Sequence, residues 1–218
     1  MAPVPLEFSR HPPGSSAEAA EHFKTSISTR RSVRHFSTDP IPDGVVETCI
    51  AAAATAPSGA NLQPWHFAVV RNPSTKRAIR LAAEAEERQF YDCRAPGDWL
   101  KALRPLGTNA DKPFLEAAPV LIAVFQKNSV PLPDGSTGKT YYPKESVGIA
   151  TGFLIAALHQ AGLASLTHTP SPLAFLNRLL SRPPGEKPFV LLVVGYPADG
   201  CTVPAITRKP LAQVISQH

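Results

Sequence analysis

Three short runs of nearly uninterrupted apolar residues constrain the fold of this chain more than any other feature. They span residues 66–70, 119–125 and 189–194. Their length is typical of buried strands, and segments with the apolar periodicity of helices separate them. This alternation predicts a single mixed α/β domain, and 218 residues suffice to bury a substantial core.

Five helices are expected between and around these strands. We expect Ser16 to cap the first helix, Asp43 the second and Ser74 the third, because short polar side chains satisfy the free N–H groups there. The expected ranges are 16–27, 45–54, 74–90, 143–161 and 173–180. The helix over 143–161 is apolar nearly all round, which indicates burial, partly in a subunit interface.

The remaining segments predict the domain organisation. Residues 1–16 are rich in proline and small polar residues and are expected to form a flexible arm. Residues 17–218 are expected to form one domain. Within it, residues 92–118 are irregular and broken by prolines, which is typical of lids and binding loops. We call residues 84–115 the lid.

Charge and cysteine content exclude several classes of protein. The net charge of +5 fits an anionic cofactor, but no basic stripe suggests nucleic acid. The three cysteines have no metal-ligand spacing, so we expect no metal site and a reducing, cytoplasmic location. No secretory signal is expected at the N-terminus. The most apolar stretch, 147–158, is shorter than the ~20 residues that a membrane span requires.

The segment 56–65 is a candidate binding loop between a small-residue helix and a strand. Pro57 ends the helix, Gly59 permits a close backbone approach, and Ser58, Asn61 and Gln63 supply hydrogen-bonding groups. The same residue types are also the usual ones of an ordinary helix-to-strand turn.

A compact basic cluster follows the first helix. Arg30, Arg31, Ser32 and Arg34 could bind phosphate, because guanidinium groups contact it bidentately. If the turn stays helical, Arg30 and Arg34 share a face. The alternative is a solvated basic helix end. The chain lacks both GxGxxG and GxxxxGK[ST], so an anionic cofactor would depend on arginine side chains.

Two further groups of polar residues have open interpretations. Thr167, His168 and Thr169 end an element where their side chains could reach a ligand, although a lone histidine is more often a packed side chain. Glu87 and Tyr91 are one helical turn apart, and Lys112 follows in the lid. Taken alone, these last three read as exposed residues on a mobile segment.

Taken together, these motifs resemble the flavin-dependent nitroreductase superfamily, and within it the iodotyrosine deiodinase branch. The resemblance covers 29–211 and rests on the arginine cluster, the 57–67 loop, the Thr-His-Thr element and a C-terminal signature over 195–211. It implies a three-layer α/β (α+β) fold with a central mixed or antiparallel sheet flanked by helices. It also implies a homodimer that exchanges C-terminal tails, with both subunits lining each site.

The resemblance further implies FMN as the cofactor. Arg30, Arg31, Ser32 and Arg208 would hold its phosphate and ribityl end, and Arg34 would lie near the pyrimidine edge. Thr169 would be the catalytic residue, with its hydroxyl directed at flavin N5, a contact that favours single-electron steps over hydride transfer. The remaining ring contacts would come from these residues: Pro57, Ser58, Thr167 and His168.

The resemblance also implies a clamp for an amino acid zwitterion. Glu87 would meet the ammonium group, while Tyr91 and Lys112 would meet the carboxylate. Arg94 and Trp99 also stand at matching spacing. The Ala60 backbone N–H would donate to the phenolate oxygen of the substrate.

The expected activity is therefore FMN-dependent reductive dehalogenation of 3-halotyrosines, with NAD(P)H or a reductase protein as the electron donor. The alternatives are a broad NAD(P)H-dependent nitro or quinone reductase and a non-catalytic flavin or halotyrosine binding protein. Animal members of the branch carry an N-terminal membrane anchor, and this chain resembles the members without one.

Overall fold

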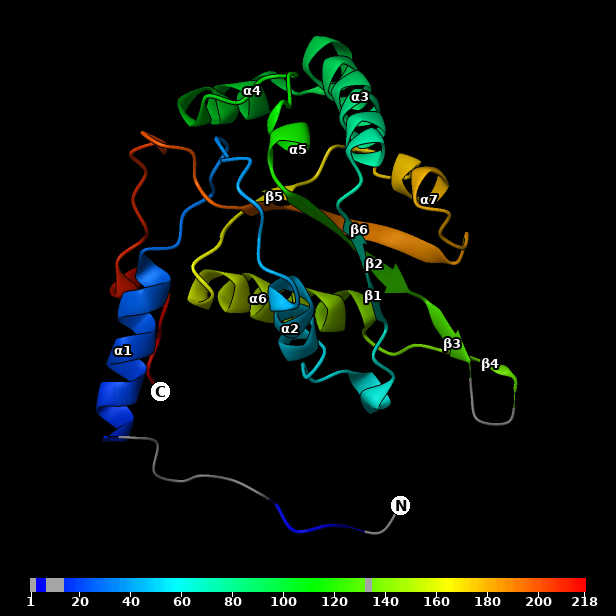
Figure 1. Ribbon diagram of the computed structural model, residues 1–218. Coiled ribbons are helices and arrows are strands. Elements are labelled where there is room, and N and C mark those ends of the chain that lie inside the picture. Colours follow the sequence, from blue (N-terminus) through cyan, green and yellow to red (C-terminus); the bar gives the residue numbers. More distant parts are fainter. Residues whose placement is uncertain (1–2, 7–13, 132–134) are drawn as a thin grey trace.

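A four-stranded antiparallel sheet forms the centre of the chain, and the computed structural model describes residues 3–6, 14–131 and 135–218 around it (Figure 1). The strand order is β1-β2-β6-β5, and each neighbouring pair is antiparallel. The three predicted strands are confirmed, and a fourth joins them. The bounds are β1 Trp65–Val70, β2 Val120–Lys127, β5 Ala164–His168 and β6 Glu186–Gly195.

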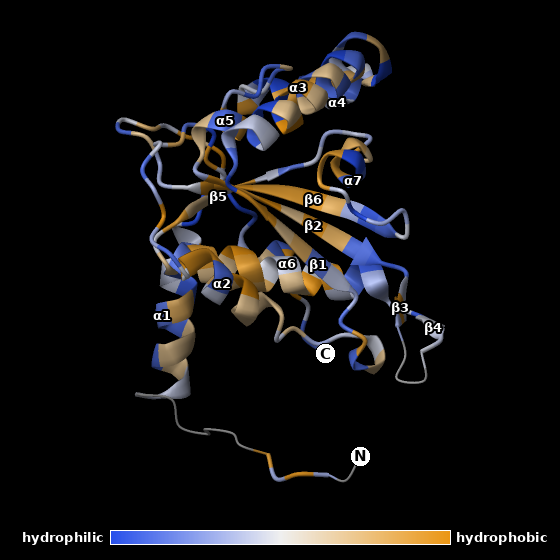
Figure 2. Cartoon of the chain, turned by 45° about the vertical axis from the view of Figure 1, so that its right-hand side comes forward, coloured by the Kyte–Doolittle hydropathy of each residue, from blue (hydrophilic) through white to orange (hydrophobic). Residues whose placement is uncertain are grey.

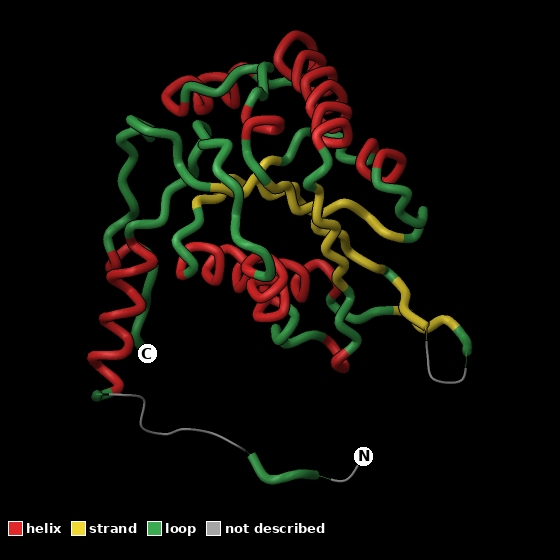
Figure 3. The backbone as a smooth tube through the Cα atoms, in the orientation of Figure 1, coloured by secondary structure: helices red, strands yellow, loops and turns green. Residues whose placement is uncertain are grey.

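Helices cover both faces of this sheet, giving three layers (Figures 1 and 3). On one face lie α2 (Val45–Ala53) and α6 (Pro143–Gln160). On the other lie α3 (Pro73–Gln89), α5 (Phe114–Ala117) and α7 (Phe175–Leu179). The expected arrangement of three layers, with a central sheet flanked by helices, is confirmed.

The two central strands explain why the sequence reads as unbroken apolar runs. Along β2, Ile122 and Val124 join the core beneath α2 and α6, whereas Leu121 and Ala123 join the core beneath α3 and α5. Strand β6 alternates in the same way, so both of its faces are buried. Figure 2 shows this continuous hydrophobic band between the layers. A strand buried on both faces has no polar face, which removes the alternation of an amphipathic strand.

The predicted helix caps were wrong by one or two residues. Helix α1 (Ser16–Ser28) is capped by Ser15, whose side chain accepts the Glu18 N–H while Glu18 bonds back to Ser15. Asn72, and not Ser74, caps α3 by accepting the Thr75 N–H at 3.1 Å.

Helix α2 also departs from the expected cap. It begins after Gly44, at a φ of 80°, and no side chain caps it, so Asp43 does not serve as predicted. A positive φ of this kind favours glycine over any capping side chain, which explains the choice of residue.

The lid contains more regular structure than expected. It includes a π-helix over Phe90–Arg94, α4 (Gly97–Leu103) and a 3₁₀ turn over Arg104–Leu106. A short antiparallel pair, β3 (Ser129–Pro131) and β4 (Thr137–Lys139), follows β2.

The terminal segments complete the description. Of the expected N-terminal arm, residues 1–16, the structure describes 3–6 and 14–16, and Ser16 already belongs to α1. Across the described parts of the chain, no helix has the length and apolar character that a membrane span needs.

Candidate functional site

A cavity of about 200 Å³ lies between the lid and the end of β5. The end of α3, the π-helix, α4 and the residues after β5 contribute its walls. Among its lining residues are predicted site residues of all three groups: Arg34, Glu87, Tyr91, Lys112, Thr167, His168 and Thr169. The structure thus gathers in one place residues that are far apart in the sequence.

The three predicted clamp residues meet in this cavity. The Lys112 Nζ lies 3.2 Å from the Glu87 carboxylate, and the two side chains are only 3% and 12% exposed. The same Nζ lies 5.7 Å from the centre of the Tyr91 ring. The interpretation of these residues as exposed charges on a mobile segment therefore does not apply.

Burial gives Lys112 an unusual electrostatic environment. Desolvation lowers the pKa of Lys112, the Glu87 carboxylate opposes this effect, and the nearby Arg34 adds to it. The Nζ also donates to the Thr108 Oγ1 at 3.2 Å and to the Asn109 carbonyl. The buried ammonium group is therefore held in place by Glu87, Thr108 and Asn109.

Arg94 and Trp99 have different positions around the clamp. Trp99 lines the cavity and meets the Phe90 ring edge-on at 5.0 Å. Arg94 instead pairs with Glu86, 3.0 Å from its carboxylate. Of these two residues, only Trp99 is therefore placed to contact a ligand in the cavity.

The Thr-His-Thr element lies at the end of the edge strand β5. Thr167 and Thr169 are exposed, whereas His168 is buried and meets the Phe114 ring edge-on at 5.6 Å. Burial lowers the pKa of His168 to about 3, helped by the charges of Lys112 and Arg34. Its Nε2 is the one buried side-chain polar atom without a hydrogen-bond partner in the described parts of the chain.

The arginine segment is extended and not helical, so Arg30 and Arg34 do not share a helix face. Helix α1 ends at Ser28, and Ser32 forms a bridge with Ser165 of β5. The Val33 N–H donates to the Ser165 carbonyl, which holds the segment beside the sheet. Strand-like backbone turns successive side chains to opposite sides.

The arginines of this segment line different cavities. Arg30 and Arg31 line a cavity of about 310 Å³. Burial lowers the pKa of Arg30, and the charges of Arg208 and Arg31 add to the effect, so these cations lie near one another.

The charges around the arginines indicate whether an anionic cofactor fits beside them. Within the described part of the chain, no carboxylate forms an ion pair with Arg30, Arg31, Arg34 or Arg208. Arg30, Arg31 and Arg34 are partly buried, whereas Arg208 is exposed. Cations without a carboxylate partner are stabilised by a bound anion, and phosphate suits the guanidinium geometry. These residues and the unpartnered His168 nitrogen therefore fit a bound phosphate-bearing cofactor.

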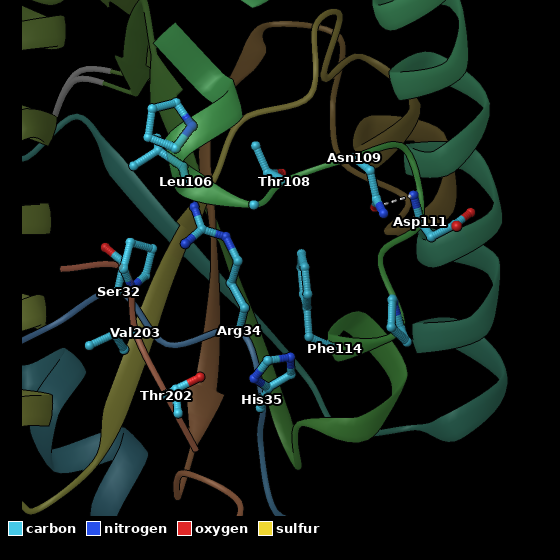
Figure 4. A pocket seen from close by; sticks show the side chains of 14 residues that line it. Ser32, Arg34, His35, Leu106, Thr108, Asn109, Asp111, Phe114, Thr202 and Val203 are labelled. Atoms are coloured by element: carbon cyan, nitrogen blue, oxygen red, sulfur yellow. Dashed lines mark hydrogen bonds between the residues drawn. The ribbon is translucent and has the colours of Figure 1, made fainter. Parts of the chain in front are cut away.

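Arg34 connects two cavities. It lines the clamp cavity and also a larger cavity of about 450 Å³, whose lining includes Ser32 and Thr108. Figure 4 shows its guanidinium group directed toward Leu106 and Thr108 of the lid. A positive group at this junction can contact a ligand that extends between the cavities.

The 56–65 loop lies apart from these cavities. It projects beyond the α2 side of the sheet, away from the lid in both views (Figures 1 and 2). Pro57, Ser58 and Ala60 line none of the three cavities described here. The structure therefore does not bring these predicted residues to the clamp of the same chain.

The backbone of this loop is nonetheless tightly specified. Ala60, Asn61 and Gln63 have φ values of 51°, 52° and 48°, a conformation that side-chain-bearing residues rarely adopt. A Cβ on Gly59 would lie 2.5 Å from the Tyr141 carbonyl oxygen. Strain of this kind persists only where the surroundings enforce it, and it is concentrated at functional sites.

Some residues of the site carry no signal in the sequence. Phe114 and Thr108 line two cavities each, and the buried Glu84 contacts the Lys112 backbone. An apolar helix residue, a loop threonine and a helical glutamate are ordinary in composition. Only their positions in space distinguish them.

Comparison with known proteins gives a consistent result. Residues 27–196 match the Nitroreductase family. An iodotyrosine deiodinase from Haliscomenobacter hydrossis is 53% identical over 199 residues, covering 91% of this chain and 89% of that protein. An iodotyrosine deiodinase from Hydra vulgaris is 40% identical over 213 residues, covering 97% of this chain and 78% of that protein.

Solved structures give the same picture. A crystal structure of oxidized iodotyrosine deiodinase bound to FMN and 3-iodo-L-tyrosine superposes with a TM-score of 0.76 at 32% identity, covering 90% of this chain and 98% of that one. A BluB-like flavoprotein from Clostridium difficile 630 has a TM-score of 0.68 at 21% identity, covering 89% and 98%, and shares the fold.

Proposed function

The chain belongs to the nitroreductase family and, within it, to the iodotyrosine deiodinases, and we propose that it is an FMN-dependent reductive dehalogenase of 3-halotyrosines. The reaction replaces the carbon–halogen bond with carbon–hydrogen, consumes two electrons and one proton, and releases halide. Iodotyrosine would yield tyrosine and iodide.

The assembled clamp is the observation that carries this proposal. A buried lysine beside a glutamate and a tyrosine offers both a cation and an anion within one cavity. When a zwitterion enters, Glu87 pairs with its ammonium group, and Lys112 with Tyr91 binds its carboxylate. A reductase for uncharged nitroaromatics or quinones has no use for this arrangement.

The cofactor, FMN, supplies the two electrons when bound. Arg30, Arg31 and Arg208 would hold its phosphate, since none of them forms an ion pair with a carboxylate among the described residues. Ser32 would bind the ribityl end, and Arg34 would lie near the pyrimidine edge. The Thr169 hydroxyl would be directed at flavin N5, and Thr167 and His168 would line the ring.

A second copy of the chain completes the site. Pro57 and Ser58 would contact the ring and the Ala60 N–H would donate to the phenolate oxygen, yet this loop lies away from the clamp of its own chain. We propose a homodimer in which each loop serves the partner's site and the C-terminal tails are exchanged.

The surface of the chain supports this arrangement. Apolar side chains remain exposed on α6, where Ile149 is 43% and Phe153 45% exposed, and on the tail, where Leu211 is 71% exposed. Ile149 and Phe153 are one helical turn apart, and neighbouring exposed apolar side chains are typical of a surface that another chain covers. The three cysteines are all free, which agrees with the cytoplasmic location that we propose.

The lid residues prepare the chemistry without taking electrons themselves. They bind the zwitterion, orient the phenol ring toward the cofactor and exclude water from the cavity. His168 stays neutral at working pH, so it adds no further positive charge beside Lys112 and Arg34. The electron donor is NAD(P)H or a reductase protein.

The test is an anaerobic assay of the FMN-loaded protein. The protein is reduced with dithionite and mixed with 3-iodotyrosine, and tyrosine and iodide are measured. A Lys112→Ala variant should lose about 10- to 100-fold in kcat/KM, because a buried charge-assisted hydrogen bond is lost. Lys101→Ala is the matched control, since this lid lysine is exposed and bonds only to Asp98 at 3.2 Å among the described residues.

Two results would contradict the proposal. One is the absence of tyrosine together with ready NADPH-driven reduction of a nitroaromatic, which would make the protein a general nitroreductase. The other is equal activity of the Lys112→Ala variant and the Lys101→Ala control on 3-iodotyrosine.

A further inference from the structure

Glu84 is a buried carboxylate that lines none of the three cavities. It lies on α3, one turn before Glu87, and is 6% exposed. Its Oε1 accepts the Lys112 backbone N–H at 2.8 Å and the Arg80 Nε at 2.7 Å. Arg88 lies 4.0 Å from its other oxygen.

The bond from Glu84 to Lys112 connects the start of the lid to its end. It joins residues 28 positions apart, and the segment between them contains the π-helix and α4. The clamp has the same division, since Glu87 and Tyr91 come from the start of the lid and Lys112 from its end. The Glu84 bond thus fixes the two halves of the clamp relative to each other.

Glu84 belongs to a row of charged residues along one face of α3. Lys76, Arg80 and Glu84 are successive i, i+4 neighbours, and each contacts the 112–118 segment. The Lys76 Nζ donates to the Glu116 and Ala118 carbonyls at 2.9 and 2.7 Å. Arg80 lies 3.5 Å from the Glu116 carboxylate. The row holds α5 at both of its ends.

The charge of Glu84 suits this role. Burial raises its pKa, but the hydrogen bonds from Arg80 and the Lys112 N–H, with the charges of Arg80 and Arg88, outweigh burial and keep the pKa below its ordinary value. An ionised carboxylate accepts a backbone N–H more strongly than a neutral group does.

We propose that Glu84 is a positioning residue that determines zwitterion specificity: it holds the Lys112 backbone on α3, so that the Lys112 ammonium faces Glu87 and Tyr91 before substrate arrives. The proposal rests on the proposed function, because the clamp is its target. Preorganisation of this kind increases affinity by reducing the ordering that binding requires.

The test measures binding to the oxidised, FMN-loaded protein by the change in flavin absorbance. The two ligands are 3-iodotyrosine, which carries the zwitterion, and 2-iodophenol, which does not. In Glu84→Ala, the Kd for 3-iodotyrosine should rise about tenfold or more while the Kd for 2-iodophenol changes less than about twofold. A general structural defect would weaken both ligands together.

Two further variants complete the design. Glu84→Gln keeps an acceptor for the Lys112 N–H and should recover most of the 3-iodotyrosine affinity. Glu86→Ala is the control on the same helix, because Glu86 pairs with Arg94 and has no described bond to Lys112. Amide exchange at residue 112 in the ligand-free holoenzyme should be faster in Glu84→Ala than in Glu86→Ala.

The outcomes separate the two proposals. If the wild type binds 3-iodotyrosine and Glu84→Ala binds it equally well, or loses both ligands in parallel, the role of Glu84 is overturned and the function stands. If the wild type does not bind 3-iodotyrosine at all, both proposals fail.

Discussion

At the scale of single residues, His168 shows how position changes the meaning of a side chain. A histidine between two threonines offers an acid, a base or a ligand. Strand alternation instead turns it inward, against Phe114 and beside the charges of Lys112 and Arg34. It is packed, as a lone histidine usually is, but its Nε2 has no hydrogen-bond partner among the described residues.

The lowered pKa of His168 predicts a pH dependence of stability. The folded pKa of about 3 lies below the unfolded value near 6.5, so between these values only the unfolded state takes up the proton. The stabilisation that neutral His168 contributes is therefore fully present above pH 6.5 and is lost as the pH falls toward 3. The contribution of His168 should decline by about 2 kcal/mol between pH 7 and pH 5.

Urea unfolding of the FMN-loaded protein at several pH values measures this decline. The His168→Asn variant, which cannot ionise, should lose less stability than the wild type over the same range. Identical slopes for the two proteins would show that His168 is protonated in the folded state.

At the scale of elements, the positions of the clamp residues depend on the π-helix, which carries Tyr91, and on α5, which follows Lys112. Tyr91 was expected one α-helical turn after Glu87, but α3 ends at Gln89 and Tyr91 lies in the π-helix over Phe90–Arg94. A π-helix changes the direction of the following side chains and is frequent at functional sites. Tyr91 nonetheless remains in the cavity with Glu87.

Helix α5 has only four residues and depends on α3 for its position. A Lys76→Met variant keeps the apolar stem but leaves the Glu116 and Ala118 carbonyls without their ammonium donor. Unsatisfied buried carbonyls should lower the free energy of unfolding by about 2 kcal/mol. The measurement is the urea midpoint relative to the exposed control Lys101→Met, and an unchanged midpoint would mean that water replaces the ammonium group.

At the scale of the whole molecule, the site is distributed between two places on the chain. The arginines, the clamp and the Thr-His-Thr element gather beside β5, whereas the strained 56–65 loop lies beyond α2. The homodimer that we propose would bring a loop to each clamp. The exposed apolar residues of α6 lie on the surface that we expect it to bury.

A Phe153→Glu variant tests this arrangement. A charge in the proposed interface should convert the dimer to a monomer in sedimentation and should release FMN, because the partner's loop is lost. The matched control is Leu81→Glu on α3, where the native side chain is 55% exposed. A Phe153→Glu protein that remains dimeric would place the interface elsewhere.

The sequence by itself determined the elements and the chemical groups. The apolar runs predicted β1, β2 and β6, because strands buried on both faces need unbroken apolar residues. The positively charged segment Arg30–Arg34 predicted an anion site, and the resemblance indicated the clamp of Glu87, Tyr91 and Lys112. Each of these signals is contained in a short window or a known motif.

The tertiary structure decided which segments of the chain lie in contact. The choice of Asn72 and Ser15 as caps depends on local backbone geometry, and the extended path of the arginine segment depends on its pairing with β5. The Glu84–Lys112 bond and the separation of Pro57 and Ala60 from the clamp arise from packing across the whole fold. Contacts between distant segments follow from the burial of shared surface, and no local pattern of residues specifies them.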